Sequence, residues 1–137
     1  MGETIFECAA GMGAPVTGVA LSADDDFSAR YDLDRIRGVF SRPAHKLYGQ
    51  SYVGKILVLN TAKGGVATAW MLLDMVSRGL APAALILNSA NPIMAQGAAF
   101  ASLPLMHEFE VDIPSQIATG NLVKVDPIAR HLIKTLR

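Results

Sequence analysis

The sequence lacks the features that mark several classes of protein. Its 137 residues include one cysteine, Cys8, which excludes an intrachain disulfide and a metal site made only of cysteines. Twelve basic and twelve acidic residues balance, so the surplus of positive charge that nucleic-acid binding requires is missing. The amino-terminal segment has neither the basic start nor the long apolar stretch of a signal peptide. We therefore expect a cytoplasmic protein that does not bind nucleic acid.

Charged residues are also scarce. They make up 18% of the chain, against about 25% in typical domains, and the run Gly79–His107 contains none. Three prolines and two asparagines interrupt that run, so it does not fit a helix that crosses a membrane. The apolar excess instead predicts that a second subunit covers part of the surface, either a partner chain or another copy of this chain. The length fits one domain over residues 1–137.

The middle of the chain predicts an α/β fold with a βαβ core. Lys55–Asn60 is an apolar, β-branched run typical of a buried parallel strand. A loop, Thr61–Gly65, leads to a helix over Val66–Arg78, which Gly79 closes, and Ala83–Leu87 is the next strand. Short connections of this kind imply parallel strands joined by a right-handed crossover. The helix is apolar nearly all round, so we expect a sheet on one side and a neighbour on another, either in this chain or in a second one.

The remaining segments are shorter or less regular. Residues 24–42 hold five acidic and four basic residues, and we interpret them as a solvated loop with a short helical turn; the alternative is that they rim a site. A second helix is expected from about Ile93 to Ala101, and the tail Ile128–Leu136 fits either a helix or a strand. The other predicted strands are Ile5–Cys8, Val16–Leu21, Leu105–Phe109 and Leu122–Val125.

The glycine loop between the first predicted strand and helix is the best candidate for a binding site. Glycines allow a ligand close to the backbone, and the helix start directs free N–H groups toward an anion. Lys63 adds positive charge, while Gly64, Gly65, Val66 and Thr68 complete the loop and first helical turn. We expect a side chain at Gly65 to obstruct the ligand. The alternative is an ordinary tight turn with a solvated lysine. The sequence does not match a nucleotide-binding P-loop.

Three polar residues in other loops are further substrate-binding candidates. His45 precedes the Lys55 strand and is expected to border the same crevice as Lys63. Asn88 and Asn91 follow the second strand, at the edge where parallel sheets bind ligands. The alternatives are a plain loop histidine and the start of a helix. The histidines have no metal-ligand spacing, so we expect no metal site, and no catalytic base can be assembled from the sequence.

Several short motifs follow one another between Gly49 and Pro127. They are Gly49-Gln50-Ser51, Gly54-Lys55, Ala81-Pro82-Ala83-Ala84 and Gln96-Gly97-Ala98, with the strand and glycine loop between them. Their order and spacing resemble the aconitase X swivel domain, a family that also occurs as the separate small subunit of two-chain dehydratases. The resemblance implies a swivelling β/β/α fold similar to the fourth domain of aconitase.

The resemblance also implies a hydro-lyase that dehydrates a small anionic hydroxy acid, such as phosphomevalonate. An iron–sulfur cluster and most catalytic groups are expected on a large partner subunit, with no cofactor on this chain. One motif departs from the family, whose loop typically reads Arg-Gly-Ser-Ser. Lys63-Gly64 matches its first half, but Gly65 and Val66 replace the serines. The alternative function is therefore a non-catalytic domain that binds an anionic metabolite and self-associates.

Overall fold

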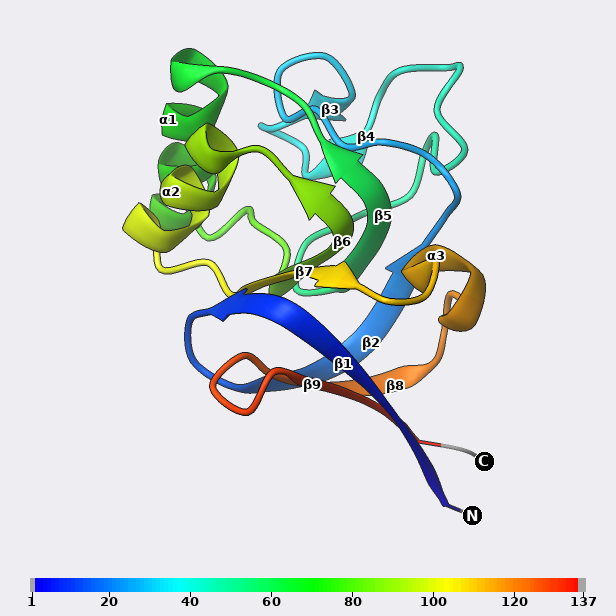
Figure 1. Cartoon of the computed structure of the whole chain (residues 1–137). Coiled ribbons are helices and arrows are strands. Elements are labelled where there is room, and N and C mark those ends of the chain that lie inside the picture. Colours follow the sequence, from blue (N-terminus) through cyan, green and yellow to red (C-terminus); the bar gives the residue numbers. More distant parts are fainter. Residues whose placement is uncertain (1, 136–137) are drawn as a thin grey trace.

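In residues 2–135, the part of the chain that the computed structural model describes, seven strands close a barrel in the order β1-β7-β6-β5-β2-β8-β9 (Figure 1). A separate two-stranded sheet, β3-β4, lies outside it. The strands are β1 (Glu3–Met12), β2 (Val16–Ser22), β3 (Leu33–Asp34), β4 (Val39–Phe40), β5 (Ile56–Ala62), β6 (Ala84–Ala90), β7 (Leu105–Phe109), β8 (Leu122–Asp126) and β9 (His131–Thr135). The helices are α1 (Val66–Ser77), α2 (Pro92–Phe100) and α3 (Ile113–Gln116).

The predicted α/β fold with its βαβ unit is confirmed. Strands β5 and β6 are parallel, with Ile56 opposite Ala84, and α1 connects them. Strands β2 and β7 extend this parallel part on either side. The barrel closes because β1, β8 and β9 add antiparallel pairs between β7 and β2.

The ambiguous tail Ile128–Leu136 contains a strand, His131–Thr135, which follows a turn over residues 128–130. His131–Thr135 pairs with β1 on one side and β8 on the other. As a strand, this segment forms backbone hydrogen bonds with both neighbours, whereas a short helix without such packing is only marginally stable. The tertiary structure therefore favours the strand, although the spacing of the apolar residues also fits a helix. Leu136, which belongs to that spacing, lies outside the described residues.

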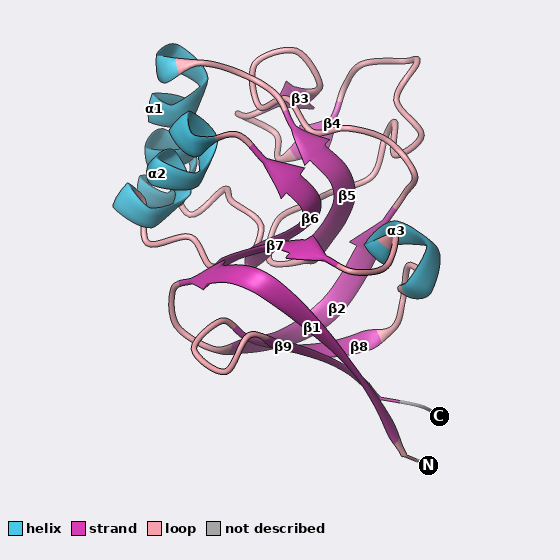
Figure 2. Ribbon diagram, viewed as in Figure 1, coloured by secondary structure: helices cyan, strands magenta, loops and turns pink. Residues whose placement is uncertain are grey.

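Helices α1 and α2 lie together on one side of the barrel (Figure 2). They approach closely at Gly97, where a Cβ atom would lie 2.7 Å from the Cβ of Ala69. On α1, Leu72 and Met75 are buried against the barrel, whereas the side opposite keeps Trp70 58% exposed. Helix α2 is therefore the neighbour of this helix within the chain, whereas a second subunit over the exposed Trp70 face stays a prediction. None of the helices within residues 2–135 is long and apolar enough to cross a membrane.

Alternating residues of the parallel strands face two different apolar clusters. Ile56 and Val58 of β5 belong to the cluster inside the barrel. Leu57 and Leu59 face outward and belong to the cluster beneath the helices. All four are fully buried, which explains why this strand is a continuous apolar run rather than an alternating one.

The prediction of a solvated loop over residues 24–42 is wrong. Phe27, Ala29 and Phe40 are fully buried and belong to the cluster beneath the helices. The segment runs beside the end of β5, because Phe27 N–H donates to Thr61 O and Lys63 N–H donates to Phe27 O. Its apolar residues thus hold it against the barrel. Asp25, Asp26, Asp32 and Arg42 come to lie next to the glycine loop, whereas Asp34 and Arg35 lie beside Asp74 and Arg78.

Candidate functional site

The glycine loop connects the end of β5 to the start of α1, as predicted. Gly64 has φ +134, and a Cβ atom there would lie 2.6 Å from the Cβ of Thr68. Gly65 is the N-cap of α1 with φ −114, and a Cβ atom there meets nothing within 4 Å. The backbone that requires glycine is therefore at Gly64, whereas Gly65 has room for a side chain within this chain.

A cavity of about 420 Å³ lies beside this loop. Three parts of the chain line it: the loop after β2, Arg42 shortly after β4, and the glycine loop with the first turn of α1. The lining residues are Asp25, Asp26, Ser28, Tyr31, Asp32, Arg42, Lys63, Gly64 and Thr68. Lys63, Gly64 and Thr68 thus share one cavity, and Gly65 and Val66 are not among the lining residues. Arg42 and the acidic residues belong to segment 24–42, for which the alternative interpretation is that it rims a site, but its charge pattern does not indicate which of these residues line a cavity.

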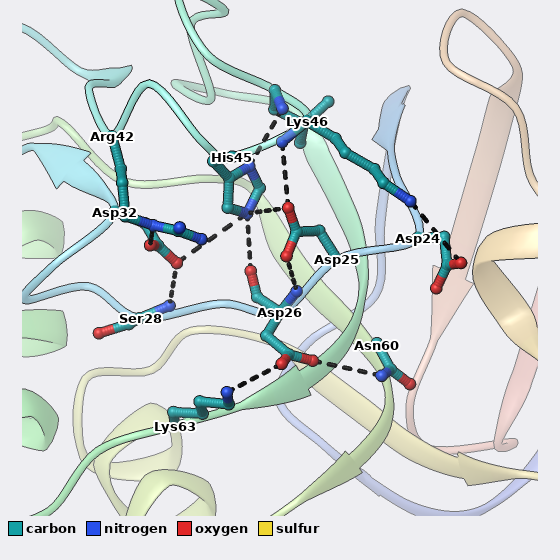
Figure 3. Close-up of polar contacts among 11 residues, drawn as sticks. Asp24, Asp25, Asp26, Ser28, Asp32, Arg42, His45, Lys46, Asn60 and Lys63 are labelled. Carbon is teal, nitrogen blue, oxygen red and sulfur yellow. Dashed lines mark hydrogen bonds and ion pairs between the residues drawn. The ribbon is translucent and has the colours of Figure 1, made fainter.

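Lys63 does not stand free in this cavity. Its Nζ lies 3.0 Å from Oδ2 of Asp26 (Figure 3). The other oxygen, Oδ1, accepts a hydrogen bond of 3.2 Å from Nδ2 of Asn60. Asn60 in turn accepts one of 2.8 Å from Nδ2 of Asn88. The Asp26 carboxylate is therefore held from two sides and neutralises part of the charge that Lys63 contributes.

The two candidate asparagines hold the surrounding backbone. Asn91 caps α2 by accepting from Met94 N–H at 2.9 Å, and its Nδ2 donates to Gly64 O at 3.2 Å. Asn88 bonds to the Asp112 carboxylate and accepts from Ile113 N–H, both at 2.8 Å. Asn91 thus forms a hydrogen bond with the glycine loop itself. Asn88 is linked to the cavity residue Asp26 through Asn60.

His45 lies behind the cavity wall. Its side chain is fully buried and stacks on Phe40 with ring centroids 4.5 Å apart. Nδ1 accepts from Leu47 N–H at 3.0 Å, so the proton belongs on Nε2, which lies 2.7 Å from Asp26 O and donates to it. The ring therefore does not face a ligand; it positions the backbone of Asp26.

The acidic residues of the cavity wall are engaged by the protein. Asp25 accepts from the N–H groups of Lys46 and Asp26. Burial acts to raise the pKa of Asp25, but these backbone hydrogen bonds and the nearby His45 and Arg42 outweigh it and hold the pKa below its usual value. The prediction of a solvated loop over residues 24–42 is therefore also wrong at Asp25, which is part of a hydrogen-bonded wall.

Asp32 and Arg42 form the opposite side of the cavity. Arg42 Nε lies 2.6 Å from Oδ1 of Asp32, while Oδ2 accepts from Ser28 N–H at 2.9 Å. Asp32 is 4% exposed, and its hydrogen bond raises the pKa of Arg42. A buried carboxylate with both oxygens bonded provides a rigid support for the arginine side chain.

The described residues offer no ligand set for a metal cluster. Among residues 2–135 no group of three or more His, Cys, Asp or Glu side chains is arranged to hold a metal ion. Cys8 lies on β1, away from the glycine loop, with its thiol donating to Ala10 O, and burial raises its pKa. A buried thiol that stays protonated is an unsuitable cluster ligand.

Comparisons with known proteins agree with this architecture. A family profile described as the aconitase X swivel domain matches residues 5–135. The phosphomevalonate dehydratase small subunit of Methanopyrus kandleri is 32% identical, over 82% of this chain and 84% of that protein. The protein of the same name from Methanocella arvoryzae is also 32% identical, over 85% of this chain and 89% of that protein.

Two solved structures share the fold over nearly the whole chain. One is the holo-form of aconitase X from Thermococcus kodakaraensis, with a TM-score of 0.87, 24% identity and coverage of 97% of this chain and 99% of that one. The other is a solution structure of a UPF0107 protein, with a TM-score of 0.83, 27% identity and coverage of 94% and 97%.

Proposed function

Because the chain belongs to the aconitase X swivel domain family, we propose that it is the small subunit of a hydro-lyase of the phosphomevalonate dehydratase type. In this proposal the cavity beside the glycine loop holds an anionic part of a small hydroxy acid. A large subunit carries the iron–sulfur cluster and supplies most of the reacting groups. The complex works in the cytoplasm.

The observation that carries the proposal is the position of the cavity. It opens at the one loop that matches the family's Arg-Gly motif, here Lys63-Gly64, and at the first turn of α1. Arg42 and Lys63 supply positive charge from two sides, and a volume of about 420 Å³ suits a small acid. The described residues lack a ligand set for the cluster, which fits a division of the chemistry between two chains.

The two loop serines that are typical of the family are absent from this chain. Gly65 and Val66 stand in their place, and the hydroxyl groups that line the cavity instead belong to Ser28, Tyr31 and Thr68. The replacement favours a second candidate function, a binding domain that holds an anionic metabolite, self-associates and catalyses no reaction.

Reconstitution with a large subunit separates the two candidates. The chain is co-expressed with an aconitase X-type large subunit from the same genome, and dehydration of phosphomevalonate and other hydroxy acids is measured. The first candidate predicts a stable complex with turnover, and no turnover by this chain alone. Lack of a complex, together with a homo-oligomer in sedimentation, would favour the second.

Gly65→Ser is the matched variant for the missing hydroxyl. The site has open space and a φ that serine adopts, so the fold should accept it. A large gain in turnover by the complex would identify the hydroxyl at this position as the group that the natural chain lacks. Unchanged turnover would show that the complex uses another base.

A further inference from the structure

The three carboxylates of the cavity wall are all held by other groups of the protein. Asp25 is bonded by two backbone N–H groups, Asp26 by Asn60 and Lys63, and Asp32 by Ser28 N–H and Arg42. The cationic side chains that line the cavity are Arg42 and Lys63, and their N–H groups are the donors that a carboxylate or a phosphate would use.

Arg42 has the largest unused donor capacity on this wall. Its Nε donates to Asp32, and within residues 2–135 no hydrogen bond of its two terminal Nη groups is found. The side chain is 40% exposed and lines the cavity. A guanidinium has five N–H donors in a fixed plane, so four remain on Arg42 for a bidentate contact with an oxyanion.

The support of Arg42 is built into the fold. Asp32 holds it twice, by the carboxylate at Nε and by the backbone carbonyl, which accepts from Ser41 N–H at 2.8 Å and Arg42 N–H at 3.3 Å. Figure 3 shows the arginine approaching Asp32 from one side and Ser28 from the other. The guanidinium is thus oriented before a ligand arrives, which reduces the entropy lost on binding.

Lys63 differs from Arg42 in this respect. Its Nζ is 3.0 Å from the Asp26 carboxylate, and its side chain is 65% exposed. An exposed lysine with a partner contributes a screened point charge, without the planar geometry of a guanidinium.

We propose that Arg42 is the side chain that binds the oxyanion of the ligand in this cavity, and that Asp32 is its positioning residue. The inference rests on the proposed function for the location of the ligand, and it adds the residue that contacts the ligand's oxyanion. Lys63 and the glycine loop complete the site on the other side.

The test is an NMR titration of the ¹⁵N-labelled full chain with inorganic phosphate and, separately, with malate. The Nε–H signal of Arg42 reports binding at this residue, and the dissociation constant is compared among variants. Arg42→Gln should weaken binding of the anion that occupies the site by about tenfold or more, the range for a lost charge-assisted contact. Arg42→Lys should give a smaller loss, because it keeps the charge but not the fork.

A matched control exists on α1. Arg78 also donates from Nε to an aspartate, Asp74, at 3.0 Å, but it does not line this cavity. Arg78→Gln should leave the dissociation constant unchanged. Asp32→Asn should weaken binding in the wild-type background and have no further effect in the Arg42→Gln background. That non-additivity separates positioning of Arg42 from a general structural role.

Three outcomes would overturn the inference: neither anion shifts the Arg42 signal, binding is unchanged in a folded Arg42→Gln variant, or Arg78→Gln weakens it equally. The comparison of phosphate with malate tells a phosphoryl ligand from a carboxylate. Arg42-dependent binding without turnover in any reconstituted complex would refute the proposed dehydratase and keep the anion site. Turnover by a reconstituted complex with an unchanged KM in the Arg42→Gln variant would support the proposed dehydratase and refute Arg42 as the residue that binds the anion.

Discussion

Replacing Gly64 by alanine should destabilise the whole domain, although the residue lies in an exposed loop. Two costs add at this position. With φ +134 the backbone lies in a region that side chains rarely adopt, which costs about 1–3 kcal/mol. The new Cβ would also lie 2.6 Å from the Cβ of Thr68, and that atom cannot swing away because it is attached to the α1 backbone.

The second cost is that of overpacking, about 1–3 kcal/mol. Together we expect a loss of about 2–6 kcal/mol, a large part of the roughly 5–15 kcal/mol that stabilises a typical domain. With an m-value of about 2 kcal/mol per M in urea, the midpoint of unfolding should fall by about 1–3 M. The measurement is urea denaturation followed by circular dichroism.

The neighbouring glycine provides the control. Gly65→Ser introduces a larger side chain one residue further on, but into open space and at a φ of −114. Serine is also a good N-cap, so stability should stay the same or rise by a few tenths of a kcal/mol. If Gly64→Ala and Gly65→Ser both unfold at the wild-type midpoint, the close approach of Gly64 to Thr68 is refuted.

Four further predictions concern two buried or half-buried side chains and one exposed aromatic pair. The buried hydroxyl of Tyr52 finds no hydrogen-bond partner in residues 2–135, so Tyr52→Phe should match or exceed wild-type stability by up to about 1 kcal/mol in urea denaturation. Burial raises the pKa of Tyr52 to about 12, so wild-type stability should fall between about pH 10 and 12 as the unfolded tyrosine ionises more readily, and Tyr52→Phe should abolish this loss. The lowered pKa of Asp25 predicts a contribution to stability that is complete above the unfolded pKa of 3.8 and disappears as the pH falls below it, so acid titrations of wild type and Asp25→Asn should converge at low pH. The exposed pair Trp70 and Phe100, with ring centroids 5.6 Å apart, predicts that the isolated chain associates and that Trp70→Ser reduces this in sedimentation; a monomeric wild type that also ignores a large subunit would contradict it.

The sequence by itself determined the parts of the fold that depend on local pattern. The continuous apolar run of β5 implied a strand buried on both faces, and the apolar helix after it ends at Ser77, one residue before the predicted end, with Gly79 following at φ +71. These features follow from periodicity and turn residues within about 25 positions. The order of short motifs identified the family for the same reason, since it is a property of the chain alone.

The tertiary structure decided how distant segments combine. It turned the tail into β9, because both β1 and β8 pair with it. It buried His45, which lies 19 residues from its partner Asp26, and it placed Arg42 on the support that Asp32 provides. Local pattern shows only that residues 24–42 are charged. Which of them are buried depends on packing against β5, and a charged side chain acquires its role from the partners that packing brings within hydrogen-bond distance.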